Sequence, residues 1–180
     1  MPKSIETTKL RNNLASAIAD VNKKKDFLIV TKSGKPVAGL VNLDLLEDIE
    51  AANSPAFIKS IKEAREQVKR GEFYTHEEVF GDLWLMSYKI KISKTAIKEL
   101  FKLDNLVKKR IKEDIETKLI KDPISNSLKL TDFEIEGVRR FRVGSYRVIF
   151  YLDKNVIEIL RVGHRRKIYK GWFVQQGRPR

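Results

Sequence analysis

The sequence predicts an α+β protein built from two modules, because helix and strand patterns alternate in both halves of the chain while the charge changes abruptly between them. The chain has 180 residues, of which 42% are hydrophobic and 34% charged, a composition typical of folded proteins. Residues 1–85 carry 13 Lys and Arg against 13 Asp and Glu, whereas residues 86–180 carry 24 against 11. The net charge of +13 therefore lies in the second half, which favours a polyanionic partner for that half.

The composition also restricts the kinds of site that we expect. The chain has no cysteine and only two histidines, which are far apart in sequence, so we expect neither a disulfide nor a metal site, and no cofactor. No apolar run approaches the roughly 18 residues of a membrane span, and no signal peptide opens the chain. We therefore expect a cytoplasmic protein with no membrane partner.

The first 50 residues predict a β-hairpin combined with helices. After an extended start at residues 4–6, Thr7 or Thr8 is a candidate N-cap of a helix that reaches Val21. The β-branched run at 27–31 and the run at 36–41 predict two strands around a turn at 32–35. A further helix is expected from Asn42 or Asp44 to Ile49.

Residues 54–80 predict helices whose apolar face lacks a partner in the first module. Ser54 followed by Pro55 is a helix start, and the helix is expected to end at Gly71. A short helix at 75–80 begins with Thr75 and Glu78 at the spacing of a capping box. Because the first 50 residues already make a closed unit, this acidic segment is expected to pack on the basic second half; packing on its own module is the alternative.

Residues 3–83 resemble the Phd/YefM antitoxin family. The resemblance depends on residues 10–14 (LRNNL), 29–37 (IVTKSGKPV) and 71–80 (GEFYTHEEVF). It implies an N-terminal part that forms a homodimer or higher oligomer and binds operator DNA, and C-terminal helices that wrap the toxin. Arg11 matches a DNA-contacting arginine, although a solvated helix face is the alternative, and Lys32 stands where an arginine is common. The implied toxin-neutralising residues are Phe57, Ile58, Ile61, Val68, Phe73, Val79 and Phe80.

The second half predicts two helices packed on an antiparallel sheet. Residues 88–92 alternate as a strand, and Ser93 is a candidate cap of the helix that follows. A second helix follows Asp104, with apolar residues at four-residue spacing as far as Leu119. The rest predicts a β-meander with strands at 137–143, 146–152 and 156–162.

A two-residue turn at Gly144-Ser145 predicts the register of the first hairpin in this meander. With Val143 opposite Tyr146, the apolar residues fall on one face and Arg140, Arg142 and Arg147 fall together on the other. Like charges on one face repel, so we expect a phosphate-binding surface there; a merely solvated basic face is the alternative. A second basic cluster, residues 163–170, combines cations with an imidazole and a phenol.

Residues 87–170 resemble the RelE/ParE toxin superfamily. The resemblance depends on residues 137–150 (GVRRFRVGSYRVIF) and 157–165 (IEILRVGHR), together with Tyr169. In the RelE branch it implies a ribosome-dependent mRNA interferase that works without metal, in which the RNA 2′-OH attacks the adjacent phosphate and leaves a 2′,3′-cyclic end. In the ParE branch it implies inhibition of DNA gyrase without cleavage, and that branch generally lacks the set of arginines and tyrosine found here.

The resemblance assigns roles position by position. It implies that Arg147 stabilises charge on the scissile phosphate and that Arg165 stabilises or protonates the leaving 5′-oxygen. It implies that Tyr169 stacks on the nucleotide or helps to deprotonate it. For the proton acceptor the candidates are His164 and a tyrosine whose pKa is depressed by nearby cations; a hydrogen-bonded strand-end histidine is the alternative for His164. The other implied RNA contacts are Arg139, Arg140, Arg142, Arg161 and Arg166.

These expectations divide the chain into a dimerising and DNA-binding module (1–53), a neutralising arm with its linker (54–85), a toxin domain (86–170) and a tail (171–180) with no family motif. Antitoxins and toxins are normally separate chains, so a self-neutralised toxin in one chain is the main hypothesis. The arm is expected to pack within one chain or to swap into a partner chain. The alternatives are a gyrase inhibitor and a degenerate toxin that acts only as a corepressor.

Overall fold

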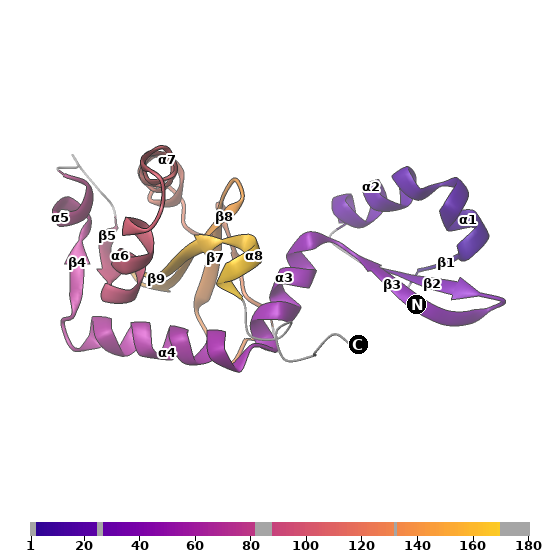
Figure 1. Cartoon of the computed structure of the whole chain (residues 1–180), viewed down its shortest axis with the longest axis horizontal. Helices are drawn as coiled ribbons and strands as arrows, with labels where there is room; N and C mark the ends of the chain where they lie inside the picture. Colours follow the sequence, from indigo (N-terminus) through magenta and orange to yellow (C-terminus); the bar gives the residue numbers. More distant parts are fainter. Residues whose placement is uncertain (1–2, 25–26, 82–87, 132, 170–180) are drawn as a thin grey trace, which may run out of the picture. The chain divides into compact units, whose positions relative to one another are not determined.

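The computed structural model describes residues 3–24, 27–81, 88–131 and 133–169, and the chain forms two compact units, Met1–Glu50 and Ala51–Arg180 (Figure 1). The seam near Met86, the joining residues 83–87 and the tail at 171–180 lie outside the described residues. None of the helices in the described part of the chain combines the length and apolar character needed to cross a membrane.

The first unit is a three-stranded sheet with helices, and it contains the predicted hairpin. Strand β1 pairs in parallel with β2, and β2 pairs antiparallel with β3, so β2 is central. The turn between β2 and β3 has positive φ at Ser33 (50°) and Gly34 (74°), as a two-residue hairpin turn requires. The elements are β1 (Ser4–Glu6), α1 (Thr7–Asn12), α2 (Leu14–Lys24), β2 (Phe27–Lys32), β3 (Lys35–Val41) and α3 (Leu43–Ala52), the last of which crosses the boundary between the units.

The first predicted helix is interrupted, which corrects the expectation of one helix from Thr7 or Thr8 to Val21. Helix α1 ends at Asn12 and α2 begins at Leu14. Between them, the Asn13 side chain donates a hydrogen bond from Nδ2 to the carbonyl oxygen of Lys9 (3.0 Å). An asparagine side chain competes in this way with the backbone for a helix carbonyl, which favours a helix end.

Much of the apolar surface of the first unit is exposed. In its sheet and first two helices, the buried hydrophobic residues are Ala17, Val21 and Val30. Five successive residues of β3, from Lys35 to Gly39, are exposed. The exposed large apolar residues of this unit are Leu14, Ile18, Phe27, Val37, Leu43, Leu46 and Ile49.

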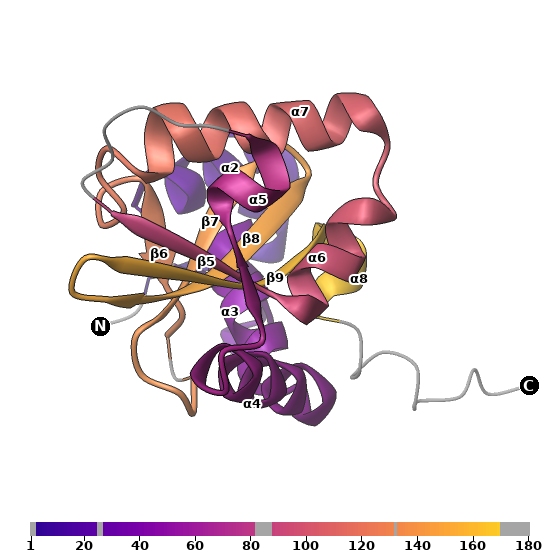
Figure 2. The ribbon, with the colours of Figure 1, turned by 90° about the vertical axis from the view of Figure 1, so that its left-hand side faces the viewer.

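The second unit is a six-stranded sheet with helices on both faces (Figure 2). The strand order is β4-β5-β9-β8-β7-β6, in which β5 and β9 are parallel and the other neighbours are antiparallel. Its elements are α4 (Pro55–Lys69), β4 (Phe73–Thr75), α5 (His76–Phe80), β5 (Lys89–Ser93), α6 (Lys94–Phe101), α7 (Asn105–Asp114), a π-helical turn (Ile115–Leu119), β6 (Ser127–Lys129), β7 (Val138–Val143), β8 (Tyr146–Asp153), β9 (Val156–His164) and α8 (Arg165–Ile168).

The predicted helix starts and the meander are confirmed in this unit. The Ser54 hydroxyl accepts from the Phe57 N–H (3.2 Å), and the Ser93 hydroxyl accepts from the Ala96 N–H (3.1 Å). Thr75 and Glu78 form both hydrogen bonds of a capping box. The sequence pattern did not predict the three-residue strands β4 and β6 or the short helix α8, because so few residues carry no measurable periodicity.

Two hydrophobic cores lie on the two faces of this sheet. The first joins α6, α7 and the π-helical turn to one face through residues such as Leu100, Ile111 and Phe150. The second joins α4 to the opposite face through residues such as Phe57, Ile61 and Ile149. Every sheet face in this unit therefore has a helical cover, but only the first cover comes from the predicted toxin domain.

A basic sheet face and its covering helix

The β7–β8 hairpin has the predicted register. Val143 pairs with Tyr146, Arg142 with Arg147 and Arg140 with Ile149. Since paired residues share a face and successive residues alternate, Arg140, Arg142 and Arg147 lie on the same side of the sheet. We refer to this side as the arginine face.

Two of the three arginines on this face are buried. Arg147 is 1% exposed and Arg140 2% exposed, whereas Arg142 is exposed. The Nη1 of Arg147 donates to the carbonyl oxygens of Gly144 (3.0 Å) and Tyr146 (2.9 Å), so the hairpin turn orients the guanidinium. The alternative of a solvated basic face therefore does not hold for Arg140 and Arg147, whereas Arg142 is exposed to solvent.

The remaining predicted catalytic residues lie at the end of β9 and in and after α8, and His164, which pairs with Tyr146, is on the side of the sheet opposite the arginine face. His164 ends β9 opposite Tyr146, and the two rings meet edge to face at 5.3 Å. The backbone N–H of Arg165 donates to the carbonyl oxygen of Ser145 (2.9 Å), which holds the start of α8 beside the hairpin turn. Tyr169 follows α8 and is 4% exposed.

The electrostatics of this cluster show that its members interact. Partial burial lowers the pKa of Arg142 from its ordinary value, Arg147 lowers it further, and Tyr169 acts in the opposite direction. The pKa of His164 is also lowered, first by desolvation and then by Arg166 and Arg165. The lowered pKa favours the neutral imidazole of His164.

A hydrogen bond defines the tautomer of this neutral histidine. His164 is the N-cap of α8, and its Nδ1 accepts from the backbone N–H of Arg166 (3.2 Å). An imidazole whose Nδ1 is an acceptor carries its proton on Nε2. The outward nitrogen of His164 is thus a hydrogen-bond donor.

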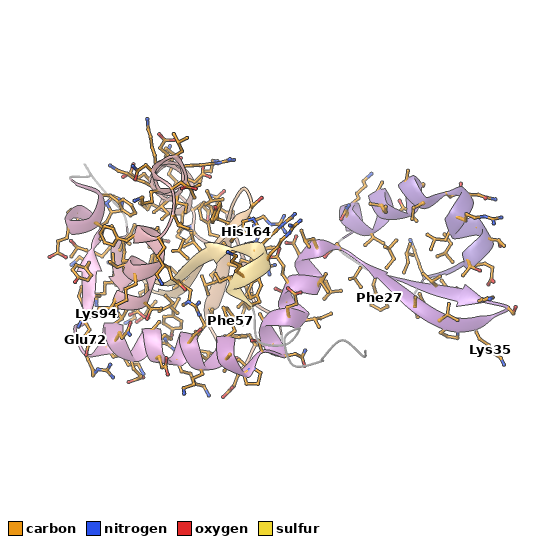
Figure 3. The ribbon with its side chains drawn as sticks, in the orientation of Figure 1. Phe27, Lys35, Phe57, Glu72, Lys94 and His164 are labelled. Atoms are coloured by element: carbon orange, nitrogen blue, oxygen red, sulfur yellow. The ribbon has the colours of Figure 1, made fainter. Side chains whose placement is uncertain are left out.

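Helix α4 packs on the same side of the sheet as the arginine face and makes an aromatic contact with Tyr169 at its first turn. Phe57, which is 2% exposed, packs edge to face on Tyr169 with ring centroids 5.0 Å apart (Figure 3 labels Phe57 on α4). The ring of Phe133 lies 5.6 Å from the Phe57 ring on another side. The predicted neutralising residue and the predicted catalytic tyrosine are therefore in direct contact.

Polar contacts along α4 extend this docking. Ser60 accepts a hydrogen bond from the Arg161 guanidinium, and the Arg65 guanidinium lies 3.6 Å from the centre of the Tyr151 ring. At the other end of the helix, Gln67 Oε1 accepts from the backbone N–H (3.2 Å) and the hydroxyl (3.0 Å) of Thr95. The helix is therefore tied to the sheet and to α6 along its length.

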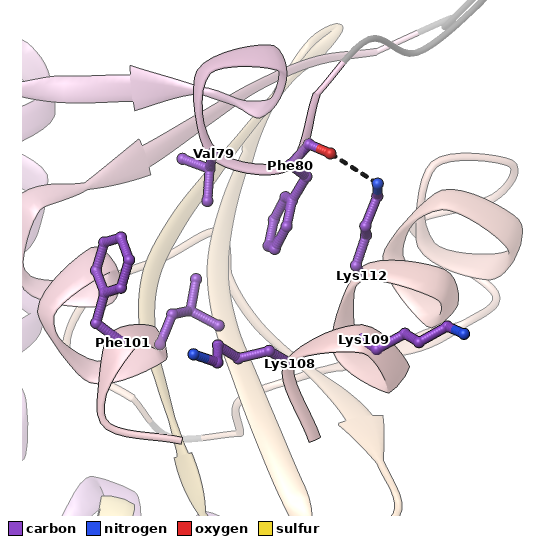
Figure 4. A pocket seen from close by; sticks show the side chains of 7 residues that line it. Val79, Phe80, Phe101, Lys108, Lys109 and Lys112 are labelled. Atoms are coloured by element: carbon purple, nitrogen blue, oxygen red, sulfur yellow. Dashed lines mark hydrogen bonds between the residues drawn. The ribbon is translucent and has the colours of Figure 1, made fainter. Parts of the chain in front are cut away.

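The segment after α4 binds the sheet edge and the first core. Strand β4 pairs with β5, and Glu72 lies 3.3 Å from the Lys94 ammonium (both labelled in Figure 3). Val79 and Phe80 of α5 border an apolar cavity of about 320 Å³ against α6 and α7 (Figure 4). The Lys112 ammonium donates to the Phe80 carbonyl oxygen (2.7 Å), a favourable charge at a helix C-terminus. All seven predicted neutralising residues pack on one of the two cores: Phe57, Ile58, Ile61, Val68, Phe73, Val79 and Phe80.

The other predicted nucleic-acid contacts are dispersed. Arg139 donates to the Ser127 hydroxyl (2.7 Å) and to the Ile124 carbonyl oxygen (2.9 Å), while Arg166 is exposed on α8. In the first unit, Arg11 is exposed on α1 and Lys32 is exposed at the end of β2.

Two contacts around the site involve residues that the sequence patterns did not single out for these roles. The Glu99 carboxylate accepts hydrogen bonds from the Arg161 Nε–H (2.7 Å) and from the backbone N–H of Val162 (2.8 Å). His76 of α5 is buried, with its Nε2 3.2 Å from Oε1 of Glu116. Both carboxylates occur in charged helical stretches, so nothing in their local sequence distinguishes them from solvated residues.

The basic cluster coincides with a match to known toxins. Residues 90–169 match the family described as ParE toxin of type II toxin-antitoxin system, parDE. Toxin RelE3 of Methanocaldococcus jannaschii is 36% identical over 84 residues, which make up 45% of this chain and 94% of the relative. The family match includes the basic cluster and leaves out α4, β4 and α5.

Solved structures of toxin-antitoxin complexes also resemble part of the chain. One chain of the RelBE2 complex from Mycobacterium tuberculosis is 26% identical, with a TM-score of 0.41, and the match covers 44% of this chain and 99% of that one. A chain of the archaeal RelE-RelB complex from Pyrococcus horikoshii is 28% identical, with a TM-score of 0.35, over 46% of this chain and 99% of that one.

Proposed function

Because the chain belongs to the RelE/ParE superfamily of type II toxins, we propose that residues 86–170 are a ribosome-dependent mRNA endoribonuclease held inactive by the covering segment, residues 54–81. The observation that carries this proposal is the contact between Phe57 and Tyr169, ring to ring at 5.0 Å. Helix α4, which lies outside the family match, packs on Tyr169. The family resemblance assigns to Tyr169 stacking on the nucleotide or its deprotonation.

The proposed reaction is cleavage of RNA by its own 2′-hydroxyl. The ribose 2′-oxygen attacks the adjacent phosphorus, the bond from phosphorus to the 5′-oxygen breaks, and the products are a 2′,3′-cyclic phosphate and a 5′-hydroxyl. The 2′-hydroxyl proton passes to a general base, and the leaving 5′-oxygen receives a proton. Positioning and charge stabilisation supply most of the catalysis in such a reaction, so a group of arginines suits it.

The geometry suggests a division of these roles. Arg147 is held by two carbonyl oxygens of its own turn and so presents a fixed cation to the scissile phosphate. The Nε2–H of His164 is placed to donate, which leaves the proton-acceptor role to Tyr169, which interacts electrostatically with Arg142. Arg165 serves the leaving oxygen, and Arg139, Arg140, Arg161 and Arg166 bind RNA once α4 is displaced.

For the N-terminal unit we propose operator binding and self-association, for autoregulation of transcription. Arg11 and Lys32 are exposed there, as DNA contacts must be. The exposed apolar residues of this unit, such as Leu14, Ile18 and Val37, suit a second copy of the chain. The covering segment docks on the sheet of its own chain, which favours neutralisation within one chain over a swapped arrangement.

A second candidate function is inhibition of DNA gyrase, because the family that residues 90–169 match is described as ParE. A third, in which the toxin domain serves only as a corepressor, follows if neither activity exists. These candidates differ in the product that each leaves, which makes them separable in one set of assays.

The decisive experiment compares residues 86–180 with the full chain. This fragment contains the whole of the family match at residues 90–169, and 84 residues of the chain suffice to cover 94% of Toxin RelE3. We expect the fragment to be toxic and to produce codon-positioned cuts by primer extension in a translating extract, while the full chain is harmless. Arg147→Ala should lower cleavage about 10²-fold, whereas Lys129→Ala, which removes one exposed positive charge on β6, should not.

Other outcomes of this experiment would decide against parts of the proposal. Inhibition of supercoiling without RNA cuts would support the gyrase inhibitor. Operator binding as the sole activity would support the corepressor. A folded fragment that proves innocuous would exclude neutralisation by residues 54–81.

A further inference from the structure

A second concave site lies beside the basic cluster and remains open while α4 covers the arginine face. It has a volume of about 360 Å³ and lies between the α6–α7 loop and the end of β9 with α8. Its lining includes residues 102–104, Tyr146, residues 162–164 and Lys167. Mononucleotide-sized ligands fit pockets of this volume.

The floor of this pocket is apolar and aromatic. Leu103 and Val162 pack on the first core, and Tyr146 and His164 are cross-strand partners whose rings meet edge to face. The Nε2–H of His164 adds one hydrogen-bond donor, because its Nδ1 is already an acceptor. Aromatic rings at the base of a cleft are the usual platform for an unpaired nucleobase.

Among the described residues that line the pocket, the cations outnumber the carboxylates. Lys102 and Lys167, which come from different segments of the chain, are both exposed. The Glu99 carboxylate, which also lines the pocket, is neutralised by the Arg161 guanidinium at 2.6 Å. Asp104 is the remaining carboxylate, and it suits the amino group of a base rather than a phosphate.

We propose that this pocket binds one nucleotide of a single-stranded RNA, with the base stacked on one of the two perpendicular rings, Tyr146 and His164, and edge-on to the other, and with the phosphate bound by Lys102 and Lys167. The RNA origin of the nucleotide rests on the proposed function, whereas the binding itself depends only on the pocket. Because the pocket is open in the covered state, the neutralised chain holds RNA without cutting it. Substrate binding and cleavage are thereby separated, because α4 blocks cleavage but not binding in this pocket.

The test is a titration of the full chain with guanosine 5′-monophosphate, followed by nuclear magnetic resonance. We expect saturable shifts at residues 102–104 and 162–167, with a dissociation constant in about the millimolar range or tighter. The double variant Lys102→Ala/Lys167→Ala should bind about tenfold more weakly. The matched control Lys108→Ala/Lys109→Ala removes the same charge from α7, at the other cavity, and should bind as the natural chain does.

Three results would overturn the proposal. The first is absence of shifts at these residues. The second is equal weakening in both double variants, which would indicate attraction by the general positive charge alone. The third is inorganic phosphate binding as tightly as the nucleotide, which would exclude a role for the base. Cleavage by residues 86–180 is measured separately, so nucleotide binding without cleavage would contradict only the nuclease function.

Discussion

The two faces of the six-stranded sheet are both buried, but they are covered in different ways. One face packs against α6 and α7 and is apolar throughout its core. The opposite face packs against α4 and buries the cations Arg140 and Arg147 among apolar residues. A buried cation needs compensating interactions, so the two faces differ in what they require for stability.

Under the proposed function, the arginine face has two occupants. With α4 in place, the apolar residues on this side of the sheet pack in the second core. We propose that RNA reaches the arginines when α4 is displaced. The first face, in contrast, packs mainly against α6 and α7, which belong to the same family match as most of the sheet, with α5 of the covering segment at its border.

The largest expected effect comes from truncating one apolar side chain on each face. Phe57→Ala and Ile111→Ala should each destabilise their core, by about 3–5 and about 2–5 kcal/mol respectively. Only Phe57→Ala should raise RNA cleavage by the full chain, because it loosens α4, whereas Ile111→Ala weakens the toxin domain itself. Cleavage assays together with urea unfolding would measure both.

An exposed residue of the same type provides the control for this pair. Phe101 on α6 is 73% exposed, so Phe101→Ala should change neither stability nor cleavage appreciably. Activation by Ile111→Ala as strong as that by Phe57→Ala would contradict the distinction between the two faces.

A smaller effect is expected from pH, through His76 in the covering segment. Burial lowers the pKa of His76 from its ordinary value of 6.5, although Glu116 and Glu77 act in the opposite direction and Lys112 acts with burial. Below pH 6.5 the undocked state therefore binds a proton that the docked state resists, and the docking of α5 should weaken as the pH falls. Above that pH both states are neutral and docking should be constant.

Hydrogen exchange of the α5 amides between pH 7.5 and 5.5 would measure this dependence. His76→Gln should flatten it. The pKa of His164 is also lowered, but that residue lies at the end of β9, so His164→Gln should leave the exchange of α5 unchanged. An α5 that becomes better protected at low pH would show that the Glu116 attraction outweighs burial.

The smallest effect compares the N-caps of one helix on each face. Ser54→Ala and Ser93→Ala should each cost about 1 kcal/mol, because each removes a hydroxyl that accepts from a helix N–H. Ser93 also donates to the Leu160 carbonyl oxygen (2.9 Å), so its loss should lower the stability of the whole unit more. Ser54→Ala should increase hydrogen exchange in α4 selectively. An equal increase in α4 in both variants would show that the helices on the two faces are not independently stable.

The local features of this protein could be predicted from the sequence because each depends on neighbouring residues. The Gly144-Ser145 turn gave the hairpin register, and alternation then placed Arg140, Arg142 and Arg147 on one face. The caps at Ser54, Thr75 and Ser93 followed from residue type and spacing. The end of helix α1 at Asn13 also depends on a local hydrogen bond, although the apolar spacing on both sides of Asn13 predicted one continuous helix.

Only the tertiary structure decided what lies against each face. Periodicity shows which residues share a side of a strand, but it contains no information about the element that packs there. The burial of Arg147, the contact of Phe57 with Tyr169 and the parallel pairing of β5 with β9 all join segments far apart in sequence. The tautomer of His164 likewise depends on its place at the start of α8. Sequence therefore determined the arginine face, and long-range packing decided that α4 covers it.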